Sequence, residues 1–214
     1  MQISVILLAG GTGSRMQNAI PKPFLSLQNK PLALHSLEVF LTRPEVQEII
    51  VVAPEQYRDI FALYPVIFAS PGARRQDSVF NGLQKAQYPW ICVHDAARPF
   101  ISDEMLTRLF IAGEKEGAAA TGMPMKFTVK EAKDGKVERT LDRSQLWEIQ
   151  TPQLLAKEVL ERGFVQANAQ QLTVTDDVSL AELIGHPVQL VHGAYENLKI
   201  TTPHDWIIAE QYEA

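Results

Sequence analysis

The 214-residue chain has little cysteine, and its single cysteine excludes any disulfide within the chain. That residue, Cys92, lies in an apolar run, where a free cysteine is expected to pack in the core. Long hydrophobic runs are also lacking, since none approaches the 18 residues of a membrane span. The N-terminus has no basic region followed by an apolar stretch. These absences predict a soluble, cytoplasmic protein with no membrane partner.

An excess of positive charge is absent as well. The chain carries 25 acidic and 20 basic residues, which gives a net charge of -5. A general nucleic-acid binder would show a basic face or a high isoelectric point, so this balance argues against a nucleic-acid partner. Clusters of Lys and Arg on an acidic background instead favour small, highly charged ligands. No repeat and no linker divides the chain, and we expect a single domain over residues 1–214.

Apolar strand-like runs alternate with helical patterns along the first half of the chain. Strands are predicted at residues 3–7, 48–53, 66–69 and 90–94, and helices at residues 34–41, 56–63, 74–86 and 103–113. Each parallel pair of strands needs a crossover, so this order predicts an α/β fold, a Rossmann-like, mostly parallel sheet with helices on both faces. Ligands of such sheets bind outside the carboxyl ends of the strands, where Gly10, Gly72 and Asp95 all fall.

The stretch from about 125 to 145 breaks this pattern. Residues 127–131 and 136–140 alternate with period two around Asp134-Gly135, which is a strong signal for a hairpin turn. A two-stranded arm is only marginally stable alone in water. We therefore expect an extended β-hairpin arm that packs on a second copy of the chain. A hairpin that lies on its own domain is the alternative.

Residues 8–14 read Leu-Ala-Gly-Gly-Thr-Gly-Ser and follow the first predicted strand directly. Glycines at a strand end expose backbone N–H groups that can approach phosphate oxygens. Arg15 and Lys22 then add cations that can stabilise charge in a transition state. The spacing fits neither a P-loop nor a dinucleotide fingerprint, because the Gly-Lys-Ser/Thr ending and the later acidic residue are missing. A glycine turn that serves only the fold is the alternative for the loop alone.

Residues 91–99 hold a second group of candidate side chains. Asp95 and Arg98 follow a buried strand and offer a carboxylate for a metal and a cation for a second anion. We expect His94 to be a hydrogen-bonded partner at the strand end rather than a base or a metal ligand. Arg74 and Arg75 open a predicted helix, where cations are electrostatically unfavourable, so an anion is expected nearby.

With these motifs in view, the chain resembles the cytidylyltransferase family that makes 4-diphosphocytidyl-2-C-methyl-D-erythritol in the non-mevalonate isoprenoid route. The resemblance covers nearly the whole chain, and His-Asp-Ala-Ala-Arg at residues 94–98 is its most specific segment. The other matching segments are residues 9–16, 21–22, 75–79, 141–143, 151–153, 175–177 and 199–201. The resemblance implies a fold of the nucleotide-diphospho-sugar transferase type, Mg²⁺ as cofactor, and a homodimer with shared active sites.

The resemblance also implies roles for individual residues. Arg15 and Lys22 would be catalytic and would act on the phosphates of CTP. Asp95 would lie beside the nucleotide and near Mg²⁺, directly or through water, while the triphosphate holds most of the metal. The rest of the CTP site would consist of Ala9, Gly10, Gly11, Gly72 and Ser78. The acceptor site would consist of Arg98, Thr151, Thr175 and Lys199, joined by Thr128 and Arg143 from the arm of the second subunit.

The reaction implied is the transfer of CMP from CTP to 2-C-methyl-D-erythritol 4-phosphate with release of pyrophosphate. The extra glycine of the first loop also resembles the related ribitol 5-phosphate cytidylyltransferases. D-Ribitol 5-phosphate is therefore the alternative acceptor, and a sugar 1-phosphate is a further one. A non-catalytic nucleotide-binding module is disfavoured, because a binder would not need cations on both reacting anions.

Overall fold

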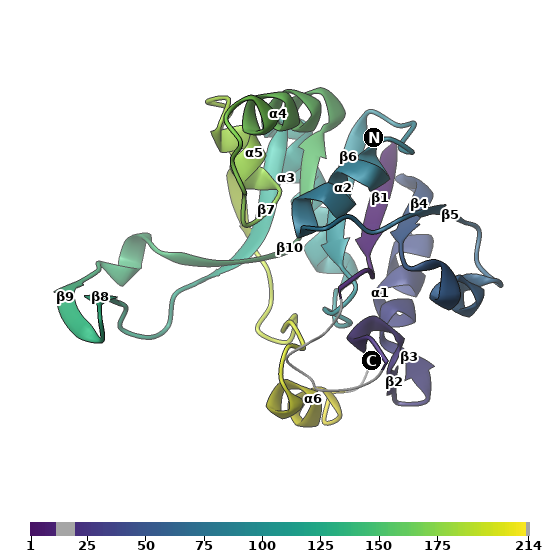
Figure 1. Ribbon diagram of the computed structural model, residues 1–214, viewed down its shortest axis with the longest axis horizontal. Coiled ribbons are helices and arrows are strands. Elements are labelled where there is room, and N and C mark those ends of the chain that lie inside the picture. Colours follow the sequence, from purple (N-terminus) through teal and green to yellow (C-terminus); the bar gives the residue numbers. More distant parts are fainter. Residues whose placement is uncertain (12–19, 213–214) are drawn as a thin grey trace.

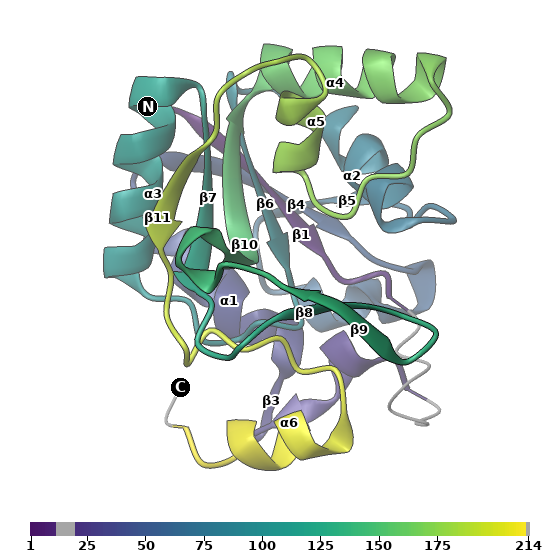
Figure 2. The ribbon, with the colours of Figure 1, turned by 90° about the vertical axis from the view of Figure 1, so that its left-hand side faces the viewer.

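The computed structural model describes residues 1–11 and 20–212. The central sheet consists of β1 (Ile3–Leu8), β4 (Val46–Val52), β5 (Val66–Ala69), β6 (Trp90–Asp95), β7 (Ala118–Pro124), β10 (Trp147–Ala156) and β11 (Gln189–His192). They form a seven-stranded sheet in the order β11-β7-β10-β6-β1-β4-β5 (Figures 1 and 2). Strand β10 runs antiparallel to β6 and β7, and the other neighbouring pairs are parallel.

Helices cover both faces of this sheet (Figure 2). One face carries α1 (Leu32–Leu41) and α3 (Asp103–Glu116), and the other carries α2 (Arg75–Leu83), α4 (Lys157–Ala169) and α5 (Val178–Glu182). Successive side chains of a strand point to opposite faces. In β1, Val5 and Leu7 therefore join the core beside α1 and α3, whereas Ile6 joins the core beside α2 and α4. The predicted α/β fold, with a mostly parallel sheet between helices, is confirmed.

Local signals place most of the predicted elements, with small shifts at their ends. Helix α3 begins where the Ser102 side chain accepts the Met105 N–H, and ends at Gly117 in the left-handed conformation, with φ 85°. Helix α2 stops at Leu83, three residues before the predicted end. The helix predicted at 56–63 is the 3₁₀ segment η3 (Glu55–Phe61).

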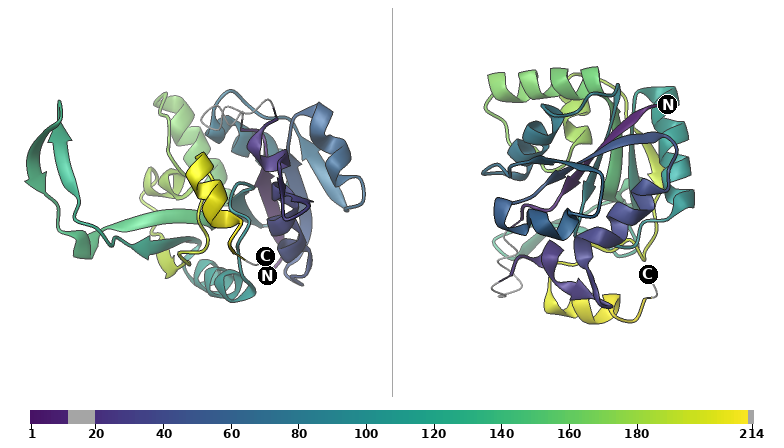
Figure 3. Two further views of the ribbon diagram at one scale, coloured as in Figure 1. Left: turned by 90° about the horizontal axis from the view of Figure 1, so that it is seen from below. Right: turned by 90° about the vertical axis from the view of Figure 1, so that its right-hand side faces the viewer.

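The predicted hairpin is present as β8 (Lys130–Lys133) and β9 (Lys136–Thr140), so its first strand begins three residues later than the sequence pattern. Asp134 and Gly135 both have positive φ, 50° and 76°, as a tight hairpin turn of two residues requires. The arm projects away from the sheet (Figures 1 and 3), and every residue of both strands is exposed. The two strands do not lie on the rest of the described chain, and packing on a second copy stays a prediction.

The C-terminal segment lies at the end of the sheet where the glycine loop follows β1. Helix α6 (Pro203–Ala209) lies beside the small ribbon of β2 (Ser26–Leu27) and β3 (Lys30–Pro31), with Ile200 buried between them (Figure 1). This packing brings Lys199 from the end of the chain to the segment that holds Lys22. Within the described ranges, no helix has the length and apolar character needed to cross a membrane.

Candidate active site

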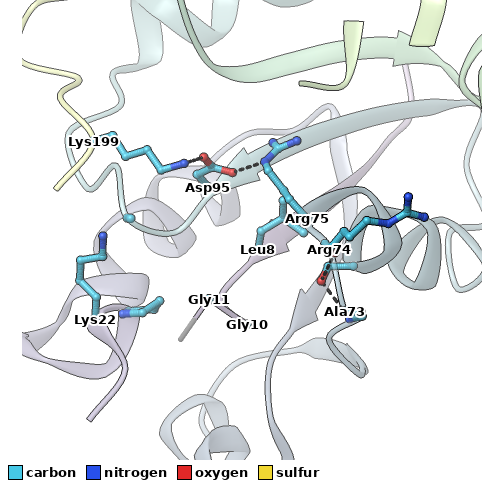
Figure 4. A pocket seen from close by; sticks show the side chains of 13 residues that line it. Leu8, Gly10, Gly11, Lys22, Ala73, Arg74, Arg75, Asp95 and Lys199 are labelled. Carbon is cyan, nitrogen blue, oxygen red and sulfur yellow. Dashed lines mark hydrogen bonds and ion pairs between the residues drawn. The ribbon is translucent and has the colours of Figure 1, made fainter. Parts of the chain in front are cut away.

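A pocket of about 380 Å³ lies where the carboxyl ends of β1, β5 and β6 meet (Figure 4). Strand β1 has β4 on one side and β6 on the other, so the order in which successive strands join the sheet reverses here, which is where open α/β sheets form ligand crevices. The lining residues come from five separate segments: Leu8, Gly10, Gly11, Lys22, Pro23, Gly72, Ala73, Arg74, Arg75, Ser78, Asp95, Ala97 and Lys199.

The glycines of the pocket have two different functions. A Cβ on Gly10 would lie 2.6 Å from the Pro71 side chain, and one on Gly72 would lie 2.3 Å from Asp77, so both allow two loops to pack closely. Gly11 has open space instead, with no described atom within 4 Å of its Cβ position. The Ser78 hydroxyl accepts the Gly72 N–H at 3.0 Å and holds the second loop in place. The first two glycines thus serve the fold, while Gly11 leaves room for a ligand.

Among the described residues, four cations line the pocket around a single carboxylate. Lys22 and Lys199 lie on one side of the glycine loop in Figure 4, and Arg74 and Arg75 lie on the other. Lys22 is almost fully buried and its Nζ donates to the Ile200 carbonyl oxygen. Such a concentration of positive charge in a concave, partly buried site suits a polyanionic ligand.

Asp95 is the carboxylate of the pocket, and cations contact both of its oxygens. Lys199 Nζ lies 2.5 Å from Oδ2, and Arg75 Nε lies 3.1 Å from Oδ1. Burial alone would raise the pKa of Asp95, but the charges of Arg75 and Lys199 outweigh it and hold that pKa well below its ordinary value. Asp95 is therefore ionised, and the pocket keeps a fixed negative charge among its cations.

Arg75 joins this site to a second buried carboxylate, Asp177. Its two terminal nitrogens donate to the two oxygens of Asp177 at 2.9 and 2.8 Å, in the bidentate geometry that Arg and a carboxylate prefer. The anion expected near Arg75 is thus formed by two protein carboxylates. The sequence pattern predicts no role for Asp177, although this residue belongs to the matching segment 175–177. Only the fold could show that it lies beside Arg75, which is 102 residues away.

His94 and Thr151 lie behind the pocket and are almost fully buried. The His94 ring contacts the Arg98 carbonyl oxygen through Nε2 at 2.9 Å and the Thr151 hydroxyl through Nδ1 at 3.2 Å. The expectation that His94 is a hydrogen-bonded partner at the strand end is confirmed. Burial lowers the pKa of His94 to about 4, so the ring is neutral near pH 7.

The structure brings together half of the residues predicted for the site. Those that line the pocket are Gly10, Gly11, Lys22, Gly72, Ser78, Asp95 and Lys199. Ala9 and Thr151 are buried, Arg98 is half-buried, and Thr175 is exposed at the start of the segment before α5. Thr128 and Arg143 flank the two strands of the arm, are exposed, and are not among the residues that line this chain's own pocket. Arg15 lies outside the described residues.

The donor set of the pocket fits a cation that is held mainly by a substrate. No group of three or more His, Cys, Asp or Glu side chains gathers for a metal among residues 1–11 and 20–212. Mg²⁺ commonly takes one or two carboxylates together with substrate phosphates and water. A single ionised carboxylate, Asp95, at the edge of a cationic pocket matches that pattern.

Comparisons with known proteins agree with this geometry. The family model for 2-C-methyl-D-erythritol 4-phosphate cytidylyltransferase matches residues 3–213. The enzyme of that name from Chlamydia pneumoniae is 46% identical, over 97% of both chains. The chloroplastic enzyme of that name from Oryza sativa subsp. japonica is 44% identical, over 98% of this chain and 73% of its own.

Solved structures give the same result. The 4-diphosphocytidyl-2C-methyl-D-erythritol synthase of Anaerococcus prevotii superposes with a TM-score of 0.88 at 31% identity, covering 99% of this chain and 95% of its own. The 2-C-methyl-D-erythritol 4-phosphate cytidylyltransferase of Thermus thermophilus superposes with a TM-score of 0.83 at 30% identity, covering 98% of both chains. The chain therefore belongs to the 2-C-methyl-D-erythritol 4-phosphate cytidylyltransferase family, as the order and spacing of its motifs predict.

Proposed function

We propose that the chain acts as one cytoplasmic domain that transfers CMP from CTP to 2-C-methyl-D-erythritol 4-phosphate, and that the pocket beside β1 binds the triphosphate. The observation that carries this proposal is the convergence of four cations and one carboxylate on a glycine-lined pocket at the switch point of the sheet. A triphosphate brings several negative charges, which these cations compensate in a partly buried site where charge interactions are strong.

The nucleotide half of the site would be built from the two glycine loops. Gly11, with open space around it, would let the triphosphate approach the backbone beside Ala9 and Gly10. Gly72 and Ser78 would face the cytosine and ribose from the second loop. Lys22 would contact the phosphates, and we keep the same role for Arg15 on the ground of the sequence alone.

The acceptor half would centre on Arg98 and Lys199. Arg98 donates through one nitrogen to the Asn197 carbonyl oxygen at 2.7 Å, while its buried Nε has no hydrogen-bond partner among the described residues. A half-buried arginine whose guanidinium has a spare donor is suited to a phosphate. Thr175 would add a contact from the segment before α5, and Thr151 would support the site from behind.

Mg²⁺ would be held by the triphosphate, by water and by Asp95, and when bound it would supply charge compensation on the phosphates. The residues of the chain would orient the two anions. An oxygen of the acceptor phosphate attacks the α-phosphorus, a new P–O bond forms, and the α–β bridging bond breaks as pyrophosphate leaves. The attacking phosphate is already an anion, so no protein base is needed, and positioning with charge stabilisation supplies the catalysis.

The arm would complete the active site of a second subunit in a homodimer. Its strands are fully exposed, and Arg143 near its base donates to the Lys126 carbonyl oxygen, while Lys126 Nζ lies 3.0 Å from the centroid of the Tyr195 ring. An exposed two-stranded ribbon needs a packing partner for stability, and a symmetric dimer provides one. Thr128 and Arg143 would then reach the acceptor in the partner.

Subunit mixing tests this assignment. We expect Arg143→Ala to raise the KM of the acceptor more than that of CTP, while Arg139→Ala on the same arm leaves both unchanged. Mixing Arg143→Ala with Lys22→Ala protein should recover about a quarter of wild-type activity, because half of the dimers are mixed and each has one intact site. If mass spectrometry shows subunit exchange and no activity returns, the site is not shared.

Pyrophosphate release tests the function directly. The purified chain is incubated with CTP and Mg²⁺, and turnover with 2-C-methyl-D-erythritol 4-phosphate is compared with turnover with D-ribitol 5-phosphate. We expect pyrophosphate only with the erythritol phosphate. Preference for the ribitol phosphate would keep the site and mechanism but change the acceptor, and no turnover with either would contradict the proposed function.

A further inference from the structure

A chain of three hydrogen bonds runs behind the pocket, from the backbone of Asp95 to the backbone of Arg98. The Asp95 N–H donates to the Thr151 hydroxyl at 3.0 Å, that hydroxyl lies 3.2 Å from His94 Nδ1, and His94 Nε2 lies 2.9 Å from the Arg98 carbonyl oxygen. The two side chains are buried, His94 fully and Thr151 to all but 5%. Neither lines the pocket, so neither is placed to contact a substrate there.

The groups at the two ends of this series of hydrogen bonds determine the direction in which each bond donates. The Arg98 carbonyl oxygen can only accept, so His94 Nε2 carries a proton and donates it. The Thr151 oxygen already accepts the Asp95 N–H, and its own proton is directed to Nδ1, which accepts. Each bond polarises the next in the same direction, which strengthens the series inside a low-dielectric core. The geometry therefore selects the neutral His94 tautomer that is protonated at Nε2.

The hydrogen-bond chain replaces a sheet ladder that stops at this point. The recorded pairing of β10 with β6 ends at Gln153 and Val93, and the next residue of β10, Pro152, has no N–H to donate. Beyond it, the Asp95 N–H still needs an acceptor because it is buried. Thr151 supplies that acceptor from its side chain, and His94 carries the connection across the turn in which the Arg98 N–H donates to the Asp95 carbonyl oxygen at 2.9 Å.

We propose that Thr151 and His94 are positioning residues that set Arg98 for the acceptor phosphate by holding the backbone of the turn at residues 95–98. Asp95 depends less on them, since Arg75 and Lys199 anchor both oxygens of its side chain. Arg98 has one side-chain bond, to the Asn197 carbonyl oxygen, and the bond from His94 to its own carbonyl oxygen. We call this chain of three hydrogen bonds the relay. Its loss should therefore raise the KM of the acceptor more than the KM of CTP. The identity of that ligand rests on the proposed function.

Thr151→Val tests the relay, because it keeps the shape of the side chain and removes the hydroxyl. We expect it to raise the acceptor KM about tenfold, the size of one lost buried hydrogen bond, with less than about a threefold change in the KM of CTP. Thr151→Ser, which restores the hydroxyl, should return the acceptor KM to near the wild-type value. Thr121→Val is the matched control, since Thr121 is also buried and its hydroxyl donates to the Pro152 carbonyl oxygen at 2.9 Å rather than to an atom of the hydrogen-bond chain.

An equal rise of both KM values, no rise in either, or a Ser variant as impaired as Val would overturn the proposal. Nitrogen-15 NMR of wild-type His94 provides a test that needs no variant to fold and no substrate. A protonated Nε2 with an unprotonated Nδ1 supports the relay, and a protonated Nδ1 overturns it. If the wild type turns over no polyol phosphate, the proposed function fails. The His94 tautomer still shows whether the hydrogen bonds of the relay run as proposed.

Discussion

The Lys22→Ala variant is expected to lose about 10²–10³-fold in kcat, the scale for removal of one preorganised electrostatic stabiliser. Lys22 is almost fully buried at the pocket wall, and its Nζ is oriented by the Ile200 carbonyl oxygen. A cation held in this way needs no reorganisation when charge develops on the phosphates of CTP. Its charge acts in a partly dry site, where it is worth more than in water.

Two further variants separate charge from packing. Lys22→Met keeps most of the side-chain volume and should lose as much activity as Lys22→Ala. Lys115→Ala removes an exposed lysine of α3 and should leave kcat unchanged. Steady-state pyrophosphate release gives kcat and thermal denaturation shows whether each variant is folded. A folded Lys22→Ala protein within about threefold of wild type would exclude the catalytic role, since that is far below the loss expected for such a stabiliser.

The Arg75→Met variant is expected to lower the free energy of unfolding by about 3–5 kcal/mol, because it leaves the buried carboxylate of Asp177 without its counter-charge and removes one of the two cations on Asp95. The Asp177 side chain is 2% exposed and that of Asp95 is 10% exposed, and Arg75 contacts both. Breaking a buried ion pair on one side costs more than the pair contributes, since the remaining charge keeps its desolvation penalty. A domain of this size has about 5–15 kcal/mol of stability in total, so the loss is large.

Urea denaturation at neutral pH measures this effect, and the neighbouring arginine is the control. Arg74 pairs with Asp77 at the surface, where both side chains are well exposed, so Arg74→Met should change stability little. The double variant Arg75→Met with Asp177→Asn should be more stable than Arg75→Met alone, because the unpaired charge of Asp177 is gone. Equal stability of the Arg75→Met and Arg74→Met proteins would contradict the argument.

As a member of its family the chain is a nucleotidyltransferase, and most of that conclusion was already present in short sequence motifs. Gly10, Gly11 and Asp95 were singled out from the sequence and Lys199 from the family resemblance, and the structure brings these four residues to one pocket. The glycines themselves needed the structure to be understood. Gly10 and Gly72 allow two loops to pack, whereas Gly11 has open space at its Cβ position among the described residues. A one-dimensional pattern does not distinguish a glycine that packs from one that leaves room for a ligand.

The sequence by itself determined the alternation of strands and helices in the first half of the chain, the hairpin and the family, because hydrophobic periodicity, turn residues and motif spacing are local properties. It did not predict β7, β10 and β11 of the central sheet or the helices from α4 to α6. Only the tertiary structure decided which distant side chains meet. Arg75 contacts Asp177, which is 102 residues away in the sequence. His94 of β6 connects Thr151 of the neighbouring strand β10 to the Arg98 backbone. These contacts depend on strand order and on where the ladder of β10 stops, and both result from packing of the whole chain rather than from any single segment.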